Sequence, residues 1–265
     1  MTDGRDLARQ YLEQQRRLGA GMVMMPDHAP SPLPIAGDRD PGSGVPDQAL
    51  PEPGPLTPIL DLPPPGITFD APGSDLFSSD PVQQAATLDA IAGLVATCTK
   101  CRLCEARTKT VPGEGAADAR LVVVGEGPGR TEDATGRPFV GQAGELLTKI
   151  LAAIDLPRER VFICNVVKCR PPENRVPQYD EIAACVPYLY RQIELIHPKV
   201  ILAMGGTAAQ TLLNTKQSLG ALRNKTHRFR GVPVIVTYHP AALLRNPHWK
   251  RPTWDDVRIA RRFFD

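Results

Sequence analysis

The sequence lacks any long hydrophobic run, although apolar residues make up 42% of it. No apolar stretch reaches the roughly 20 residues that a membrane-spanning helix needs. The first residues, MTDGRDLARQYLEQQRRLG, also lack the apolar core of a signal peptide. These two absences argue against membrane and secreted proteins. We therefore expect an intracellular protein whose six cysteines do not form disulfide bonds.

Aromatic residues are also scarce, at 5% of the chain, whereas proline is abundant and unevenly placed. Residues 1–83 hold 15 of the 28 prolines and carry 5 Lys and Arg against 12 Asp and Glu, a net charge of −7. Helical spacing predicts a short helix within residues 1–25, and the proline runs predict a disordered Pro-rich linker over residues 26–83. We interpret the linker as a solvated spacer, and the alternative is a tether that docks a protein partner.

Residues 84–265 differ from this leader in charge and in pattern. They carry 26 Lys and Arg against 17 Asp and Glu, a net charge of +9, which favours a polyanionic partner. Short apolar runs alternate with helical patterns, which predicts a three-layer α/β/α fold with a central four-stranded, mainly parallel sheet. The expected strands are residues 120–125, 161–167, 199–205 and 232–238. The expected helices are residues 84–97, 141–154, 179–196, 207–213 and 254–264.

Polar segments rich in glycine and proline follow three of these strands, at residues 125–129, 164–175 and 238–247. All three are expected at one edge of the sheet, where ligands bind in such folds. The first segment, GEGPG, does not match the G-x-G-x-x-G dinucleotide fingerprint, and a long loop is expected before the next helix. We therefore reject dinucleotide binding and predict a rigid backbone loop that approaches a flat ligand closely.

The six cysteines divide into two kinds. Cys164 lies inside an expected apolar strand and is interpreted as an inert core thiol. The others are spaced like metal ligands, because CxxC-type pairs and distant cysteines together form four-thiolate sites for zinc or a [4Fe–4S] cluster. Spacing alone leaves the choice of metal open. These five are Cys98, Cys101, Cys104, Cys169 and Cys185.

Three motifs in order along the chain, together with these cysteines, resemble the family-4 uracil-DNA glycosylases, the iron–sulfur type. The motifs are GEGPGRTEDATGRPFVGQAGELL, NVVKCRPPENRVP and HPAALLRNP, and the similarity spans about residues 86–260, including KRPTWDDV. The resemblance implies a uracil-DNA glycosylase domain over residues 84–265 with a [4Fe–4S] cluster. The implied ligands are Cys98, Cys101, Cys169 and Cys185, with Cys104 as an alternative to Cys98 or Cys101.

The resemblance also implies an activity. The protein would be a DNA-repair hydrolase that flips uracil out of DNA, cleaves its N-glycosidic bond and leaves an abasic site. It would act on uracil-containing DNA as a monomer, in the cytoplasm and associated with the nucleoid. Its cluster is expected to be structural, holding the first helix of the domain and the loop after the second strand together.

Substrate-binding residues are implied at the strand ends. Asn165 would accept a hydrogen bond from uracil N3–H and donate one to O4, a pattern that cytosine reverses. Phe139, one of seven phenylalanines, would stack on the flipped base. The backbone of Glu126 and Gly127 would line the pocket, and Asn174 its mouth. Without the resemblance, Asn165 would be interpreted as a capping residue and Phe139 as an ordinary core residue.

Catalysis is implied at His239, which would hydrogen-bond to uracil O2 and stabilise the leaving anion. Some related glycosylases carry an aspartate for the attacking water where this sequence has Gly127. Glu126 is therefore the expected residue for water positioning or electrostatic support. Glu132 would lie near C5 of the base and disfavour the methyl group of thymine. The alternative for both carboxylates is a solvated loop residue, and for His239 it is a structural or metal-binding histidine.

DNA contacts are implied for the HPAALLR segment. Leu243 or Leu244 would wedge into the space left by the flipped nucleotide, and Arg245 would contact phosphate. Further phosphate contacts are expected from three basic residues of the second motif, Lys168, Arg170 and Arg175.

Three other functions fit parts of the pattern. An iron–sulfur DNA-binding or electron-transfer protein would share the cysteines, but it would not need Asn165, Phe139 and His239 together. A sister glycosylase that traps uracil-DNA covalently would carry a long basic insert with a reactive histidine, where this chain has the short PPENRVP. Release of other bases, such as hypoxanthine or xanthine, is disfavoured by the GEGPG motif.

Overall fold

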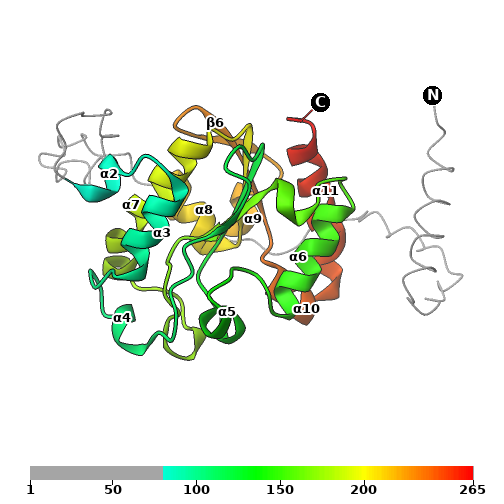
Figure 1. Cartoon of the computed structure of the whole chain (residues 1–265). Helices are drawn as coiled ribbons and strands as arrows, with labels where there is room; N and C mark the ends of the chain where they lie inside the picture. The colour runs from blue at the N-terminus through cyan, green and yellow to red at the C-terminus, as the bar shows by residue number, and fades with distance from the viewer. Residues whose placement is uncertain (1–79, 265) are drawn as a thin grey trace, which may run out of the picture. The chain divides into compact units, whose positions relative to one another are not determined.

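The computed structural model describes residues 80–264 (Figure 1). The helix expected within residues 1–25 lies outside this range, and so does the expected linker except for its last residues. There the structure has α2 (Pro81–Gln84), which begins where Asp80 accepts a hydrogen bond from the backbone N–H of Val82 at 3.0 Å. Helical structure therefore begins ahead of the boundary expected at residue 84. Within the described range, no helix combines the length and apolarity needed to cross a membrane.

The described residues build a six-stranded sheet in the order β1-β3-β2-β4-β6-β5. Its four inner strands run parallel, as predicted, and the antiparallel edge strands β1 and β5 make the predicted count of four wrong. The edge strands are short and contain glycine or polar residues, so no apolar run marks them in the sequence. The strands are β1 (Glu114–Gly115), β2 (Leu121–Gly125), β3 (Phe162–Asn165), β4 (Val200–Met204), β5 (Thr226–Phe229) and β6 (Val232–Thr237).

Helices fill the connections between the strands. Four of them lie close to the expected ranges: α6 (Gln142–Ala152), α7 (Tyr179–Ile196), α8 (Gly206–Leu213) and α11 (Lys250–Arg261). The helix expected over residues 84–97 is split into α2 and α3 (Leu88–Ala96), because Thr87 starts a new helix by accepting a hydrogen bond from Ala90 N–H at 3.1 Å. The short helices are α4 (Leu103–Ala106), α9 (Leu219–Leu222), α10 (Pro240–Arg245), η1 (Arg158–Arg160), η2 (Pro172–Asn174) and η3 (Pro247–Trp249).

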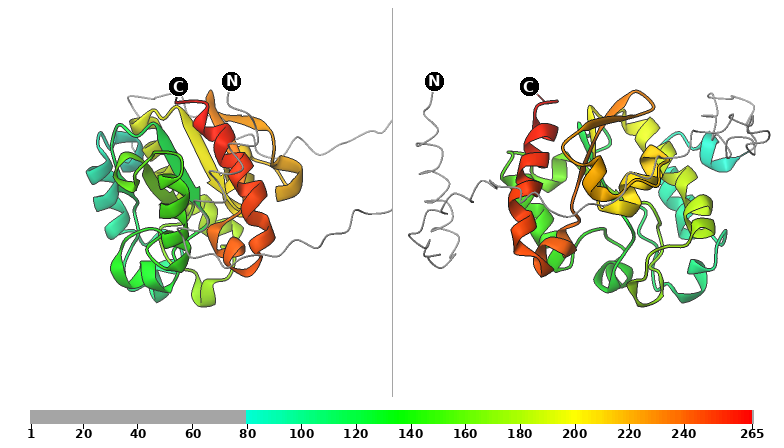
Figure 2. Two further views of the ribbon diagram at one scale, coloured as in Figure 1. Left: turned by 90° about the vertical axis from the view of Figure 1, so that its right-hand side faces the viewer. Right: turned by 180° about the vertical axis from the view of Figure 1, so that it is seen from behind.

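Side chains of the inner strands alternate between two hydrophobic clusters, one on each face of the sheet. Val122 and Val124 belong to a cluster with α3, α7 and α8, whereas Leu121 and Val123 belong to one with α6 and α11. Figures 1 and 2 show these two groups of helices on opposite faces of the sheet. Because both faces are covered, every residue of β2 and β4 is buried, which explains the continuous apolar runs. The predicted three-layer α/β/α fold is confirmed.

The prediction of a long loop between GEGPG and the next helix is wrong. The helix α5 (Arg130–Thr135) follows the glycines directly, with Gly129 at its N-cap. Glu132 completes this start by accepting a hydrogen bond from Gly129 N–H at 3.1 Å. The sequence RTEDAT gives no helical signal because it contains no apolar periodicity. The dinucleotide fingerprint still fails, since the spacing of the glycines does not match it.

Candidate active site and thiol pocket

A cleft of about 610 Å³ opens at the carboxyl ends of the inner strands. The register pairs Gly125, the last residue of β2, with Asn165, the last residue of β3. His239 reaches the same edge two residues after the end of β6. The topology therefore brings motifs that are far apart in the sequence to one cleft. Its lining includes the expected catalytic and substrate-binding residues Glu126, Gly127, Glu132, Phe139, Asn165, Asn174 and His239.

Asn165 presents an unsatisfied acceptor to this cleft. Its side chain is 1% exposed, and its Oδ1 has no hydrogen-bond partner among residues 80–264. Buried polar groups are nearly always paired in folded proteins. An unpaired acceptor in the wall of a cleft therefore indicates that a ligand supplies the donor.

Phe139 lies beside Asn165 because Gly125 leaves room for both side chains. A Cβ on Gly125 would lie 2.4 Å from Asn165 Oδ1 and 2.5 Å from Phe139 Cζ, so only glycine fits there. Phe139 itself has a φ of 50°, a left-handed conformation that is rare for a bulky residue. Such strain persists only where the surroundings enforce it.

The loop that carries Phe139 is held by two charged side chains. Glu132 Oε1 accepts hydrogen bonds from the backbone N–H groups of Val140 and Gly141, both at 2.9 Å. From the other side, Arg158 Nη1 donates to the carbonyl of Phe139 at 3.0 Å. Arg158 was not singled out from the sequence, because nothing in its local pattern marks it. These contacts make Glu132 a clamp for the loop, and its interpretation as a solvated carboxylate is wrong.

His239 is placed as a neutral hydrogen-bond donor. It caps α10, where its Nδ1 accepts from Ala241 N–H at 3.2 Å, and this leaves Nε2 as the protonated nitrogen of the neutral ring. Burial lowers the pKa of His239 to about 4; Arg245 acts in the same direction, and Glu132 opposes it. The ring lies 5.4 Å from that of Phe139 between centroids, with 31° between the planes. The cleft therefore combines an unpaired acceptor, an aromatic ring and a neutral N–H donor.

Glu126 makes a contact that the sequence did not suggest. Its Oε2 accepts a hydrogen bond from Thr207 Oγ1 in the first turn of α8. Its backbone carbonyl accepts a hydrogen bond from Val167 N–H at 3.1 Å. Both contacts fix Glu126 in the lining of the cleft, with Gly127 next to it. The site thus has a second oriented carboxylate besides the clamp Glu132.

The lining of the cleft also contains an aromatic stack that was not expected from the sequence. Tyr238 and Trp249 stack with ring centroids 4.5 Å apart and 8° between their planes, and both line the cleft. The Arg223 guanidinium covers Tyr238 at 4.2 Å and forms an ion pair with the buried Asp256 at 2.8 Å. Asp256 lies in the KRPTWDDV segment, which is the part of the sequence that could have pointed to this ion pair.

Two of the residues expected to touch DNA are buried. Leu243 is 1% exposed and packs in the core, whereas the adjacent Leu244 is 45% exposed. The prediction that Leu243 wedges into the duplex is therefore wrong, and Leu244 is the leucine that is accessible from outside. Lys168 is also 1% exposed, and its Nζ donates to Asn165 O at 2.8 Å and to Gln192 Oε1 at 2.7 Å. A phosphate contact by Lys168 is therefore wrong as well.

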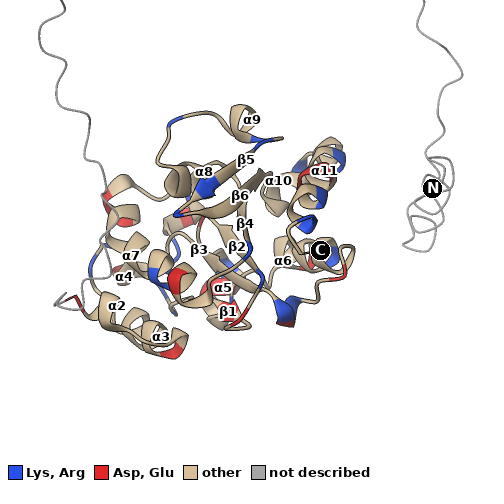
Figure 3. Cartoon of the chain, turned by 90° about the horizontal axis from the view of Figure 1, so that it is seen from above, with Lys and Arg blue, Asp and Glu red and all other residues tan. Residues whose placement is uncertain are grey.

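The other basic residues expected at DNA have mixed surroundings. Arg170 Nε donates to Asn174 Oδ1 at 2.8 Å, and Arg175 forms an ion pair with the buried Glu181 at 2.6 Å. Arg245 lines the cleft next to His239. Figure 3 shows further basic residues on α11, close to α10. Positive charge is thus available at Arg245 in the lining of the cleft and on α11 close to α10.

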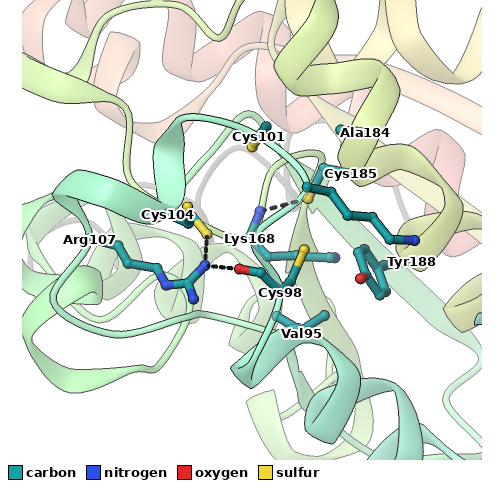
Figure 4. A pocket seen from close by; sticks show the side chains of 11 residues that line it. Val95, Cys98, Cys101, Cys104, Arg107, Lys168, Ala184, Cys185 and Tyr188 are labelled. Carbon is teal, nitrogen blue, oxygen red and sulfur yellow. Dashed lines mark hydrogen bonds between the residues drawn. The ribbon is translucent and has the colours of Figure 1, made fainter.

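A second, smaller cavity of about 10 Å³, the thiol pocket, is lined by all five candidate ligand cysteines (Figure 4). Arg107 Nη1 donates to the carbonyl of Cys98 at 2.7 Å and to Cys169 Sγ at 3.2 Å. The backbone N–H of Lys168 donates to Cys185 Sγ at 3.2 Å. Cys164 lies elsewhere, fully buried in β3, which confirms it as a core thiol.

The thiols of this pocket are partly withdrawn from water. Burial raises the pKa of Cys185 to about 12 and also raises that of Cys169. The positive charges of Lys168 and Arg107 act against burial at Cys185 and Cys169 respectively. Across residues 80–264, no three His, Cys, Asp or Glu side chains are placed to hold a single metal ion. The pocket nevertheless gathers five thiols around a common space, and the sulfurs of Cys169 and Cys185 accept hydrogen bonds.

Comparisons with known proteins agree with this geometry. A family model described as the uracil DNA glycosylase superfamily matches residues 112–259. The type-4 uracil-DNA glycosylase of Thermotoga maritima is 47% identical over 180 residues, which cover 66% of this chain and 94% of that protein. The type-4 enzyme of Saccharolobus solfataricus is 48% identical over 180 residues, 64% of this chain and 83% of its own. That of Sulfurisphaera tokodaii is 45% identical over 184 residues, 66% of this chain and 84% of its own.

Proposed function

The chain belongs to the uracil-DNA glycosylase superfamily, and we propose that it is a hydrolytic uracil-DNA glycosylase of the type-4 class. It acts in DNA repair by flipping uracil out of DNA, hydrolysing its N-glycosidic bond and leaving an abasic site. The observation that carries this proposal is the buried, unpaired Oδ1 of Asn165 next to Phe139 at the strand ends. A planar base with a ring N–H would satisfy that acceptor.

Base selection follows from the direction of the hydrogen bonds at Asn165. Uracil presents N3–H, which would pair with the unpaired Oδ1, and O4, which would accept from Nδ2. Cytosine presents an acceptor at N3 and a donor at the neighbouring position, so both side-chain groups would face like groups. Leaving such buried groups unpaired costs about 1–3 kcal/mol each. Phe139 would add stacking on the face of the base.

Bond cleavage depends on His239. When the glycosidic bond breaks, its electron pair moves onto uracil and negative charge collects on O2. The Nε2–H of His239 would donate to this oxygen, and a donor that is already oriented needs no rearrangement during the reaction. Because its pKa is lowered to about 4, the ring stays neutral at pH 7 and donates a hydrogen bond without transferring its proton. Glu126, oriented by Thr207, would hold the water that adds to the sugar.

We also propose that Cys98, Cys101, Cys169 and Cys185 hold a [4Fe–4S] cluster, with Cys104 as the alternative to one of the first two. The lining of the pocket fits this group, because it offers thiols, no carboxylate, and N–H donors to two of the sulfurs. When bound, the cluster would supply a covalent cross-link between the α3–α4 segment, the loop at Cys169 and α7, and it would take no part in bond cleavage.

The DNA surface would lie around the mouth of the cleft. Leu244 would enter the space vacated by the flipped nucleotide, and Arg245 would bind a flanking phosphate. The net charge of +9 on residues 84–265 favours this contact. The protein would act as a monomer on DNA in the cytoplasm, associated with the nucleoid. Residues 26–83 would serve as a spacer or as a docking segment for a protein partner.

The proposal is tested with the full chain and an oligonucleotide that contains one uracil. After incubation, alkali cleaves abasic sites, and a gel shows whether the strand breaks at the uracil. We expect breakage in single- and double-stranded substrates, none with thymine or cytosine at the same position, and none with the Asn165→Leu variant. An iron-containing wild-type protein that binds the DNA without releasing uracil would overturn the proposal in favour of a non-catalytic iron–sulfur protein.

A further inference from the structure

Lys168 contacts both functional regions of the molecule. Its Nζ donates to the backbone carbonyl of Asn165 at 2.8 Å and to Gln192 Oε1 at 2.7 Å. Gln192 is held in turn, because its Nε2 donates to Pro112 O at 2.7 Å. At its other end, the backbone N–H of Lys168 donates to Cys185 Sγ at 3.2 Å, and its side chain lines the thiol pocket (Figure 4). A single residue therefore contacts both the backbone of Asn165 and the sulfur of a candidate cluster ligand.

The charge of Lys168 is not accounted for by the fold alone. It is 1% exposed, and the acceptors of its Nζ, Asn165 O and Gln192 Oε1, are uncharged. Within residues 80–264, none of the ion pairs includes Lys168. A buried charge is strongly destabilising unless an opposite charge lies near it. Deprotonated cysteines of a metal-loaded thiol pocket would supply that opposite charge.

We propose that Lys168 is a positioning residue that couples the thiol pocket to base recognition. Its ammonium holds the backbone carbonyl of Asn165 and thereby the segment from which the side-chain amide of Asn165 projects, while its charge balances the loaded thiol pocket. The inference rests on the proposed function, because it assigns Asn165 to the base. It separates Lys168 from the basic residues that would bind phosphate, since a buried ammonium does not reach DNA.

The test compares Lys168→Met with Lys149→Met in the full, iron-loaded chain. Methionine keeps most of the volume of the lysine stem but removes the ammonium, and Lys149 is an exposed lysine on α6. Two duplexes serve as probes: one with 2′-fluoro-deoxyuridine, which resists cleavage and offers an intact base, and one with an abasic site. We expect Lys168→Met to bind the fluorinated uracil duplex about 10–100-fold more weakly, as for a lost buried hydrogen bond. Its affinity for the abasic duplex should be unchanged.

A second measurement does not depend on DNA. With an iron chelator present, the visible absorption of Lys168→Met should disappear several-fold faster than that of wild type or Lys149→Met, because the balancing charge is gone. Equal affinities for the fluorinated duplex, or equal loss of affinity for both duplexes, would overturn the proposal. Faster iron loss without a change in uracil binding would also overturn it, since the two regions would then not be coupled.

A second variant covers the case in which Lys168→Met does not fold. Gln192→Met leaves the ammonium with one acceptor fewer, and it should produce the same selective loss on a smaller scale. If both variants fail to fold, Lys168 only supports the fold and the proposal is wrong. If wild type does not distinguish the fluorinated uracil duplex from undamaged DNA, the proposed function is at fault, and the chelator measurement still judges the role of the charge.

Discussion

The cleft and the thiol pocket are assembled in different ways. The cleft, of about 610 Å³, lies where strand ends meet, and its central groups keep hydrogen-bonding capacity free for a ligand. The thiol pocket, of about 10 Å³, lies between the α3–α4 segment, the loop at Cys169 and the interior of α7, and two of its sulfurs accept hydrogen bonds from the protein itself. Substitutions in the cleft should therefore change the reaction rate with little effect on stability. The thiol pocket joins segments of the fold, so substitutions there should change stability.

Phe139 is an exception to this contrast between cleft and thiol pocket, because it lines the cleft but its loop is held in place by the fold. Its strained φ of 50° persists because Glu132 and Arg158 hold the loop on both sides. In the proposed function, Asn165 and His239 would act on the base through their free hydrogen-bonding groups, and the clamped loop would set the shape around them. Substitutions at Asn165 or His239 should therefore lower the reaction rate, whereas substitutions in the thiol pocket should lower the free energy of unfolding.

The largest effect is expected for His239→Asn, which tests whether a change in the cleft lowers the reaction rate without lowering stability. Asparagine still accepts a hydrogen bond at the start of α10, as His239 does from Ala241 N–H at 3.2 Å, but it removes Nε2–H. Loss of one oriented donor to a developing anion lowers kcat by about 100–1,000-fold. Single-turnover kinetics on a uracil duplex would measure the rate, and chemical denaturation would measure the free energy of unfolding.

The free energy of unfolding should stay within about 1 kcal/mol of wild type, since the cap is kept. A rate within a few-fold of wild type would mean that His239 does not supply the catalytic donor. A large loss of stability with a preserved rate would reverse the comparison between the two regions.

The second-largest effect is expected for Cys185→Ser, which tests whether the thiol pocket stabilises the fold. Serine removes a soft ligand from α7, so iron content and visible absorption should fall. The free energy of unfolding should drop by about 2–5 kcal/mol, as when a covalent cross-link is removed from a small domain. Cys164→Ala is the matched control, because Cys164 is buried in β3 outside the pocket. If Cys185→Ser kept its iron while Cys164→Ala lost it, the assignment of ligands would be wrong.

The core of the fold could be predicted from sequence because burial on both faces leaves its own signal. The inner strands are continuous apolar runs, and α7 begins and ends where helical spacing predicts. The edge strands β1 and β5 and the helix α5 could not be predicted, because they are short and polar. Their formation depends on pairing with β3 and β6 or on the contact between Glu132 and Gly129 N–H.

The candidate site could likewise be predicted only in part, because some of its features depend on contacts between distant segments. The rule that ligands bind at the carboxyl ends of parallel strands placed Asn165, Phe139 and His239 correctly in one cleft. Which neighbouring residue faces the core is not set by composition. Leu243 is buried and Leu244 exposed because α10 packs against α6, a contact between segments nearly a hundred residues apart. Lys168 likewise resembles any loop lysine until the position of Gln192 is known.

A smaller effect is expected from pH, and it separates rate from stability at one residue. The pKa of His239 is about 4 in the folded protein, against 6.5 for an ordinary histidine. Between these values the unfolded chain binds a proton that the folded chain does not, so the free energy of unfolding falls as pH decreases from 6.5 to 4. The loss is at most about 3 kcal/mol and less for a ring in partial contact with water.

Above pH 6.5 this contribution is fully present, and the neutral donor persists down to about 4, so His239 should not lower the rate between pH 8 and pH 5. Denaturation at pH 7 and pH 5 should show a stability difference that shrinks in His239→Asn. A rate that fell with an apparent pKa near 6.5 in wild type would instead place an exposed, ordinary histidine at the site.

The smallest effect separates two adjacent leucines of α10. Leu244→Ala should lower uracil release from duplex DNA by about 3–10-fold and leave release from single strands unchanged, because only a duplex has a stacked space to fill. Leu243→Ala should instead reduce the free energy of unfolding by about 2–5 kcal/mol through a cavity, with the ratio of duplex to single-strand rates unchanged. Gel assays on both substrates, with denaturation curves for both variants, measure the two quantities. An equal loss on both substrates for Leu244→Ala would remove the wedge and leave Arg245 as the contact that α10 makes with DNA.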